Sequence, residues 1–78
     1  MMLMNEPVDI LVFKTNIQLK EDIEKIVLTL NEDIRIKRWT VDREDCDKVL
    51  RVEASHMNPA DVIELIKKAG YACEELSN

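Results

Sequence analysis

The sequence predicts one α+β domain whose elements follow the order β-α-β-β-α-β. Four short apolar stretches are typical of strands, two longer stretches have apolar residues at helical spacing, and polar turn residues separate them. A chain of 78 residues can bury one small core. We therefore expect a single domain over residues 8–76, preceded by an N-terminal tail over residues 1–7.

Residues 8–14 are expected to form the first strand, with apolar residues on both faces, as is typical of a central strand. The first helix follows and is expected to end near Asn31. Its predicted buried stripe contains Ile23, Ile26, Val27 and Leu30. Thr15 and Gln18 have the spacing of a capping box, so Thr15 or Asn16 is the expected N-cap.

Residues 34–42 are predicted to form the second strand. Its apolar positions change face at Lys37 and Arg38, which indicates a β-bulge, although a later start of the strand would also explain the change. Trp39 is expected to cover the core beside the helix ends. A polar turn over residues 42–47 leads to the third strand. The apolar positions of that strand are Leu50, Val52 and Ala54.

The second helix has clear predicted boundaries. Asn58 is the expected N-cap, Pro59 the first helical residue, and Gly70 the left-handed residue that ends the helix. Its predicted buried stripe contains Val62, Leu65, Ile66 and Ala69. Residues 71–76 are expected to form a short edge strand.

With right-handed crossovers, this order predicts a ferredoxin-like sandwich: a four-stranded antiparallel sheet, strand order 4-1-3-2, with two helices on one face. Three connections then share one end, which we term the loop end: residues 15–22, the hairpin 42–47, and the turn at Gly70 and Tyr71. His56 is expected at the opposite end, as a solvated residue.

Composition excludes several classes of function. A net charge of −5 argues against binding to nucleic acid. The apolar start has no basic flank, so we expect neither a signal peptide nor a membrane span. Cys46 and Cys73 are expected to be reduced, unreactive thiols too far apart for a disulfide, in a cytoplasmic protein. No catalytic constellation is found, so we predict that the chain is not an enzyme.

Four segments add to the order of the elements. They are Phe13-Lys14-Thr15-Asn16-Ile17, Trp39-Thr40-Val41-Asp42, Asp47-Lys48-Val49-Leu50-Arg51-Val52 and Ile66-Lys67-Lys68-Ala69-Gly70-Tyr71. Together they resemble the heavy-metal-associated domain of copper-chaperone type, from about Ile10 to Leu76. The resemblance implies a metal-transport family, whose members hold metal through Cys-x-x-Cys in the loop after the first strand.

The Cys-x-x-Cys motif is absent here. The resemblance places its cysteine positions on Leu19 and Asp22, and a register three residues earlier would use Asn16 and Leu19. Neither pair supplies the thiolates that a soft ion such as Cu(I) prefers. The resemblance therefore implies a degenerate domain without high-affinity Cu(I) binding and without a cofactor.

The family often recognises protein partners with the end that holds metal. The resemblance therefore implies a docking surface whose predicted residues are Asn16, Ile17, Leu19, Asp22 and Tyr71. An ordinary helix start, in which the leucine packs and the acids favour the helix dipole, also explains this stretch. The partner, and the choice between a monomer and a weak dimer, stay open.

Two other functions stay open. Residual metal binding could use Cys46, Cys73 or acidic residues of the hairpin, which otherwise form a solvated face or attract a Lys-rich partner. Those acidic residues are Asp42, Glu44, Asp45 and Asp47. An ACT-like small-molecule sensor has the same order of elements, but it usually carries glycine in the first loop, which this chain lacks.

Overall fold

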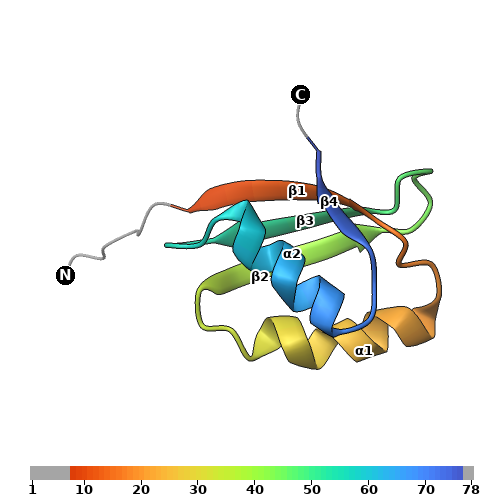
Figure 1. Ribbon diagram of the computed structural model, residues 1–78, viewed down its shortest axis with the longest axis horizontal. Helices are drawn as coiled ribbons and strands as arrows, with labels where there is room; N and C mark the ends of the chain where they lie inside the picture. The colour runs from red at the N-terminus through yellow and green to blue at the C-terminus, as the bar shows by residue number, and fades with distance from the viewer. Residues whose placement is uncertain (1–7, 77–78) are drawn as a thin grey trace.

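The computed structural model describes residues 8–76, so the predicted tail over residues 1–7 lies outside the described part. The elements are β1 (Asp9–Thr15), α1 (Lys20–Asn31), β2 (Ile36–Asp42), β3 (Val49–Ala54), α2 (Pro59–Lys68) and β4 (Cys73–Glu75). They follow the predicted order, and the predicted α+β class is confirmed (Figure 1). Neither helix has the length and apolar character needed to cross a membrane.

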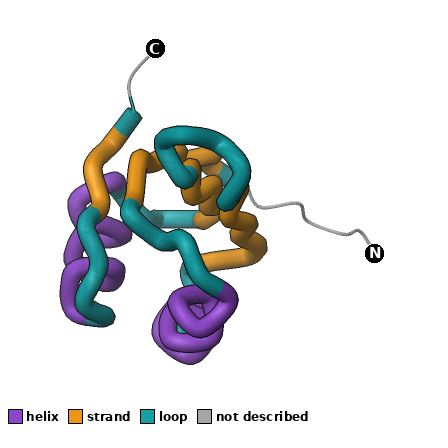
Figure 2. Tube along the Cα trace, turned by 90° about the vertical axis from the view of Figure 1, so that its right-hand side faces the viewer, coloured by secondary structure: helices purple, strands orange, loops and turns teal. Residues whose placement is uncertain are grey.

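The four strands form one antiparallel sheet in the order β2-β3-β1-β4, which is 4-1-3-2 when read from the β4 edge. As expected, β1 is an inner strand. Figures 1 and 2 show both helices on the same side of this sheet. Because β1 and β3 are antiparallel, α1 begins at one end of the sheet and α2 begins at the opposite end.

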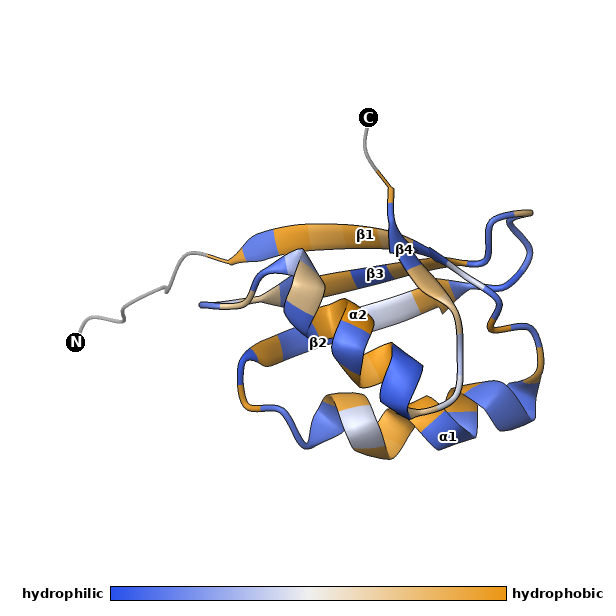
Figure 3. Cartoon of the chain, in the orientation of Figure 1, coloured by the Kyte–Doolittle hydropathy of each residue, from blue (hydrophilic) through white to orange (hydrophobic). Residues whose placement is uncertain are grey.

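One hydrophobic core lies between the sheet and the helices. Its buried residues are Phe13, Ile17, Ile26, Leu30, Leu50, Val52, Ala54, Met57, Val62, Ile66 and Cys73. Only one face of β1 contributes to this core, because Ile10 on the other face is 51% exposed. In Figure 3, β1 is largely hydrophobic, whereas the hairpin between β2 and β3 is largely hydrophilic. This polar hairpin contributes to the loop end.

The predicted bulge in β2 is confirmed. Ile36 pairs with Ala54 and Arg38 pairs with Glu53, so the register shifts by one residue at Lys37. This shift turns Trp39 toward the core, where it is half-buried and its indole Nε1–H donates to Asn31 Oδ1 at 2.9 Å. Trp39 therefore covers the core, as predicted.

The predicted start of the second strand at Ile34 is wrong. Ile34 is 87% exposed and lies in a turn, and β2 begins only at Ile36. The Asp33 carboxylate accepts hydrogen bonds from the backbone N–H of Arg35 at 2.9 Å and from its guanidinium at 2.7 Å. These bonds hold the turn, so the chain enters the sheet two residues later than its hydrophobicity suggests.

Both ends of α2 follow the prediction. Asn58 Oδ1 accepts from the Asp61 N–H, and Asp61 Oδ2 accepts from the Asn58 N–H, both at 3.1 Å. Gly70 has a φ of 100°, and the N–H groups of Gly70 and Tyr71 donate to the carbonyls of Lys67 and Ile66. This pair of bonds is a Schellman motif, which ends the helix and fixes the direction in which Tyr71 leaves it.

Candidate functional site: the loop end

The loop end forms as predicted. The β1–α1 connection and the β2–β3 hairpin lie at the same end of the sheet, and the connection that contains His56 lies at the other (Figure 1). The Thr15 N–H donates to the carbonyl of Asp47 at 3.0 Å, and the Thr15 hydroxyl donates to the carbonyl of Lys48 at 2.6 Å. These two bonds fasten the hairpin to the end of β1.

The expected cap of α1 is wrong. The Thr15 hydroxyl is engaged with Lys48 and also accepts from the Ile17 N–H at 3.2 Å, so it does not reach the helix. The N-cap is Leu19, which has no polar side-chain atom. Instead, the Asp22 carboxylate accepts from the Leu19 N–H at 2.9 Å. Half of a capping box is thus present, without the half that the N-cap side chain normally supplies.

Tyr71 joins the α2–β4 turn to the start of α1. Its hydroxyl donates to Asp22 Oδ1 at 2.8 Å, across 49 residues of sequence. The Leu19 N–H, the Tyr71 hydroxyl and the Gln18 N–H lower the pKa of Asp22, in that order of effect. Burial and the neighbouring Asp22 raise the pKa of Tyr71. Both shifts favour the ionised Asp22 and the neutral Tyr71 that the hydrogen bond requires.

A second bond joins the same two segments. Asn16 Oδ1 accepts from the Ala72 N–H at 2.9 Å. Four of the five predicted docking residues are therefore brought to the place where the first loop meets the α2–β4 turn, namely Asn16, Leu19, Asp22 and Tyr71. Each of them takes part in a hydrogen bond, through the backbone N–H in Leu19, Asp22 and Tyr71 and through the side chain in Asn16.

Ile17 is a correction to the predicted docking set. Its side chain is fully buried in the hydrophobic core, because the loop turns inward where the Ile17 N–H bonds to the Thr15 hydroxyl. Ile17 therefore anchors the loop to the core, and its side chain is not accessible to a partner. Leu19 differs from the packed leucine of an ordinary helix start, since it is 57% exposed.

The positions that the resemblance assigns to metal ligands carry no matching ligand set. Leu19 presents hydrocarbon, and both oxygens of Asp22 accept hydrogen bonds from Tyr71, Leu19 and Gln18. In the alternative register, the carboxamide oxygen of Asn16 accepts from Ala72. A soft ion would find no thiolate at either pair of positions.

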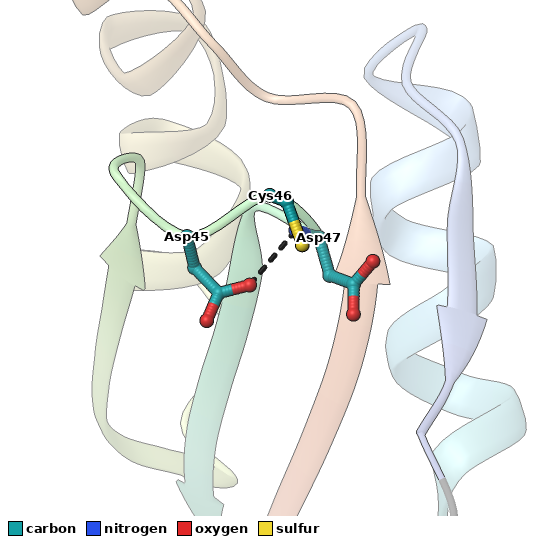
Figure 4. A group of neighbouring side chains, drawn as sticks. All are labelled: Asp45, Cys46 and Asp47. Carbon is teal, nitrogen blue, oxygen red and sulfur yellow. Dashed lines mark hydrogen bonds between the residues drawn. The ribbon is translucent and has the colours of Figure 1, made fainter.

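The hairpin holds a different group of side chains. Ligand atoms of Asp45, Cys46 and Asp47 lie within 4.8 Å of one another (Figure 4). However, Asp45 Oδ1 accepts from the Asp47 N–H at 2.8 Å, and Asp47 Oδ1 lies 3.8 Å from Lys14 Nζ. This group supplies only one thiol, whereas Cu(I) favours several thiolates. It also supplies fewer oxygen ligands than the six to eight of Ca²⁺ sites.

Turn formation explains part of the predicted acidic face. Asp42 Oδ1 accepts from the Glu44 N–H at 3.1 Å, and Asp45 Oδ1 accepts from the Asp47 N–H. Both are bonds from a side chain to the backbone two residues on, which is how aspartate favours turns. The acids therefore shape the hairpin, and they also leave the loop end negatively charged.

The two cysteines are free thiols, as expected, in unlike surroundings. Cys46 is exposed on the hairpin, whereas Cys73 is 8% exposed and belongs to the core. Burial raises the pKa of Cys73 to about 11, although the charge of Lys67 opposes this shift. Cys73 is therefore a neutral, enclosed thiol, and a metal site that joins it to Cys46 has no support in this arrangement.

The loop end thus offers one exposed apolar side chain, a fixed polar backbone and an acidic hairpin. No protein-family model matches the chain, and neither does any curated protein.

Proposed function

We propose that this chain is a degenerate heavy-metal-associated domain: a non-enzymatic, metallochaperone-like module that docks a protein partner through its loop end and has no high-affinity Cu(I) site. The ferredoxin-like arrangement is part of this proposal. The order of the elements and the antiparallel sheet support it, as does the meeting of Asn16, Asp22 and Tyr71 at the loop where the family carries its motif.

One observation carries the proposal: Leu19 is 57% exposed at a position whose backbone is fixed. Leucine is a poor N-cap, since asparagine, aspartate or serine would bond to the exposed N–H groups of the first turn. The fold therefore gains no cap from this leucine. An apolar side chain on a rigid backbone can insert into a partner's pocket with little loss of conformational entropy.

The negative charge of the loop end indicates which kind of partner would bind there. The β2–β3 hairpin, which carries the acidic residues, lies at the same end of the sheet as the start of α1, where Leu19 is the N-cap. The whole chain carries a net charge of −5. A partner with an apolar pocket surrounded by lysine or arginine would match this end. Electrostatic attraction would then raise the rate of association and make it sensitive to salt.

Photo-crosslinking tests the docking surface with a matched control. A benzophenone side chain is placed at position 19 in one variant and at position 28 in another, because Leu28 is 69% exposed and lies on the same helix. In extract of the source cells, we expect a discrete adduct from position 19, weakened by added salt, and none from position 28. Equal adducts from both positions, or none from position 19, would contradict the proposal.

A second candidate function is weak metal binding at the hairpin. It is favoured by the proximity of ligand atoms in Asp45, Cys46 and Asp47. Zn(II) titration of the reduced chain and of Cys46→Ser would test it, since a hairpin site would lose affinity in the variant. The ACT-like sensor stays a prediction.

A further inference from the structure

A separate feature near the loop end is an open pocket of about 370 Å³. It lies where the end of α2, the start of β4 and the end of β1 meet. Its lining residues are Lys14, Thr15, Asn16, Lys67, Ala72, Cys73 and Glu74. None of the proposed docking residues except Asn16 takes part, so the pocket needs its own explanation.

The inner wall of this pocket is fixed and uncharged. Thr15 is 7% exposed, and its hydroxyl is already donated to the carbonyl of Lys48. The neighbouring thiol of Cys73 is neutral, since its pKa is raised to about 11. The bond from the Ala72 N–H to Asn16 holds the two sides together. This wall can therefore contact an apolar group without reorganising.

The rim of the pocket has an excess of positive charge. Two lysines, Lys14 and Lys67, stand against one carboxylate, Glu74. Lys14 has only a long ion pair, 3.8 Å to Asp47, and its side chain is 54% exposed. Among the described residues, no carboxylate lies within ion-pair distance of Lys67. Lys67 lines the pocket together with Cys73, and its charge opposes the rise in the pKa of that thiol.

A second pocket provides a contrast. About 320 Å³ in volume, it lies between the helices and is lined by Thr29, Glu32, Asp33, Leu65 and Lys68. Its lining has two carboxylates and one lysine, and the Asp33 carboxylate is paired with the Arg35 guanidinium at 2.7 Å, so this pocket has no excess of positive charge. An anion would therefore favour the pocket at β4 over the pocket between the helices, even though the whole chain is acidic.

We propose that the pocket at β4 binds a small aliphatic carboxylate, whose hydrocarbon part lies against Ala72 and Cys73 and whose carboxylate pairs with Lys67 and Lys14. The anion would supply the counter-charge that the described residues do not offer Lys67. A short branched acid combines one negative charge with an apolar part, which match the two lysines and the apolar wall of the lining. This proposal does not depend on the docking function, because it uses neither Leu19 nor the Asp22–Tyr71 contact.

Titration of the ¹⁵N-labelled full chain with sodium isovalerate, against the neutral isovaleramide at matched ionic strength, tests the proposal. We expect the carboxylate to shift the amides of Asn16, Ala72 and Glu74 with a dissociation constant in the millimolar range, as befits so small a ligand. Lys67→Gln should weaken binding roughly threefold, the usual effect of losing one exposed ion pair.

Lys68→Gln is the matched control, because it removes the same charge from the same last turn of α2 but lines the other pocket. We expect it to leave the affinity for isovalerate unchanged. The proposal is overturned by equal shifts from the amide and the acid, by equal weakening in the two variants, or by the absence of shifts at these three residues.

Discussion

The two helices begin differently although each has an aspartate at its third position. In α2, Asp61 and the side chain of Asn58 bond to each other's backbone N–H groups, so the cap is complete within four residues. In α1, the Asp22 carboxylate accepts from the Leu19 N–H in the same way, but the side chain of Leu19 has no atom that could accept from the Asp22 N–H. The start of α1 is held instead by Tyr71, from the far end of the chain.

The start of α2 is stabilised by its own cap, whereas the start of α1 leaves the Leu19 side chain exposed. A local cap like that of α2 stabilises a helix typically by about 1 kcal/mol. The start of α1 lacks that contribution and depends on tertiary structure, which also keeps Leu19 in one place. The start of α2 is thus closed by its own side chains, whereas the start of α1 leaves Leu19 exposed, as the proposed docking role requires.

Gly70→Ala should have the largest effect among the changes that probe this comparison. A left-handed backbone costs alanine roughly 1–2 kcal/mol, and no atom lies within 4 Å of the added Cβ, so the loss comes from the backbone alone. Because Gly70 directs Tyr71 toward Asp22, hydrogen exchange should speed up at the Leu19 amide and not at the Asn58 amide. Urea unfolding and exchange measured by NMR provide both readings.

Gly70→Asn is the control for that change, since asparagine tolerates the left-handed region better than alanine does. We expect it to lose about half as much stability as Gly70→Ala does. Equal exchange at the Leu19 and Asn58 amides in Gly70→Ala would show that the start of α1 does not depend on the turn.

Exchanging the two caps should have effects of opposite sign. Asn58→Leu removes the side-chain half of a complete box and should destabilise the chain by about 1 kcal/mol. Leu19→Asn completes the box in α1 and should stabilise the chain by about 0.5–1 kcal/mol. Urea denaturation of both variants checks the signs. Destabilisation by Leu19→Asn would mean that Leu19 serves the fold through packing, which would weaken the case for a docking role.

Tyr71→Phe removes only the hydroxyl that bonds to Asp22, so we expect it to lower the free energy of unfolding less than the preceding destabilising substitutions do. In the folded chain the pKa of Asp22 is lowered below 3.8. The stability that the ionised Asp22 contributes is therefore present above the unfolded pKa and is lost as pH falls through the folded pKa. The variant should raise the pKa of Asp22 part of the way back, because the bond from Leu19 stays. NMR titration of the carboxylate measures this shift, and an unchanged pKa would contradict the role of Tyr71.

The pH dependence has an alkaline side as well. The folded chain raises the pKa of Tyr71 above 10.0, so the stability that comes from its neutral form is present below the unfolded pKa and is lost as pH rises through the folded pKa. Tyr71→Phe should remove this alkaline loss of stability and reduce the acidic one. Unfolding curves at both extremes of pH, compared with the unsubstituted chain, test this pairing.

Local signals in the sequence predict much of this fold. Asn58, Gly70 and the change of face at Lys37 each correspond to the expected cap, helix end and bulge, because each is determined by neighbours within a few residues. The cap of α1 could not be found in this way. The hydroxyl of Thr15 is taken by Lys48, which lies 33 residues away in the sequence.

The candidate site was predictable to the same extent. The resemblance located the loop and Tyr71, and the described contacts bring them together. It could not foresee that Ile17 faces the core while Leu19 faces solvent, since both are apolar residues in one short loop. Only the path of the backbone, fixed by Thr15 and Asp22, separates them.

The most direct test of the account is a titration with Cu(I) and Zn(II), under reducing conditions, followed through backbone amides. We propose that the loop end lacks the metal chemistry of the family that the sequence resembles. We therefore expect that the amide signals of residues 16–22 and of Tyr71 do not shift, whether or not the hairpin around Cys46 responds. Shifts of residues 16–22 and Tyr71 at micromolar metal would contradict it, because they would mean that a metal site survives there with other ligands.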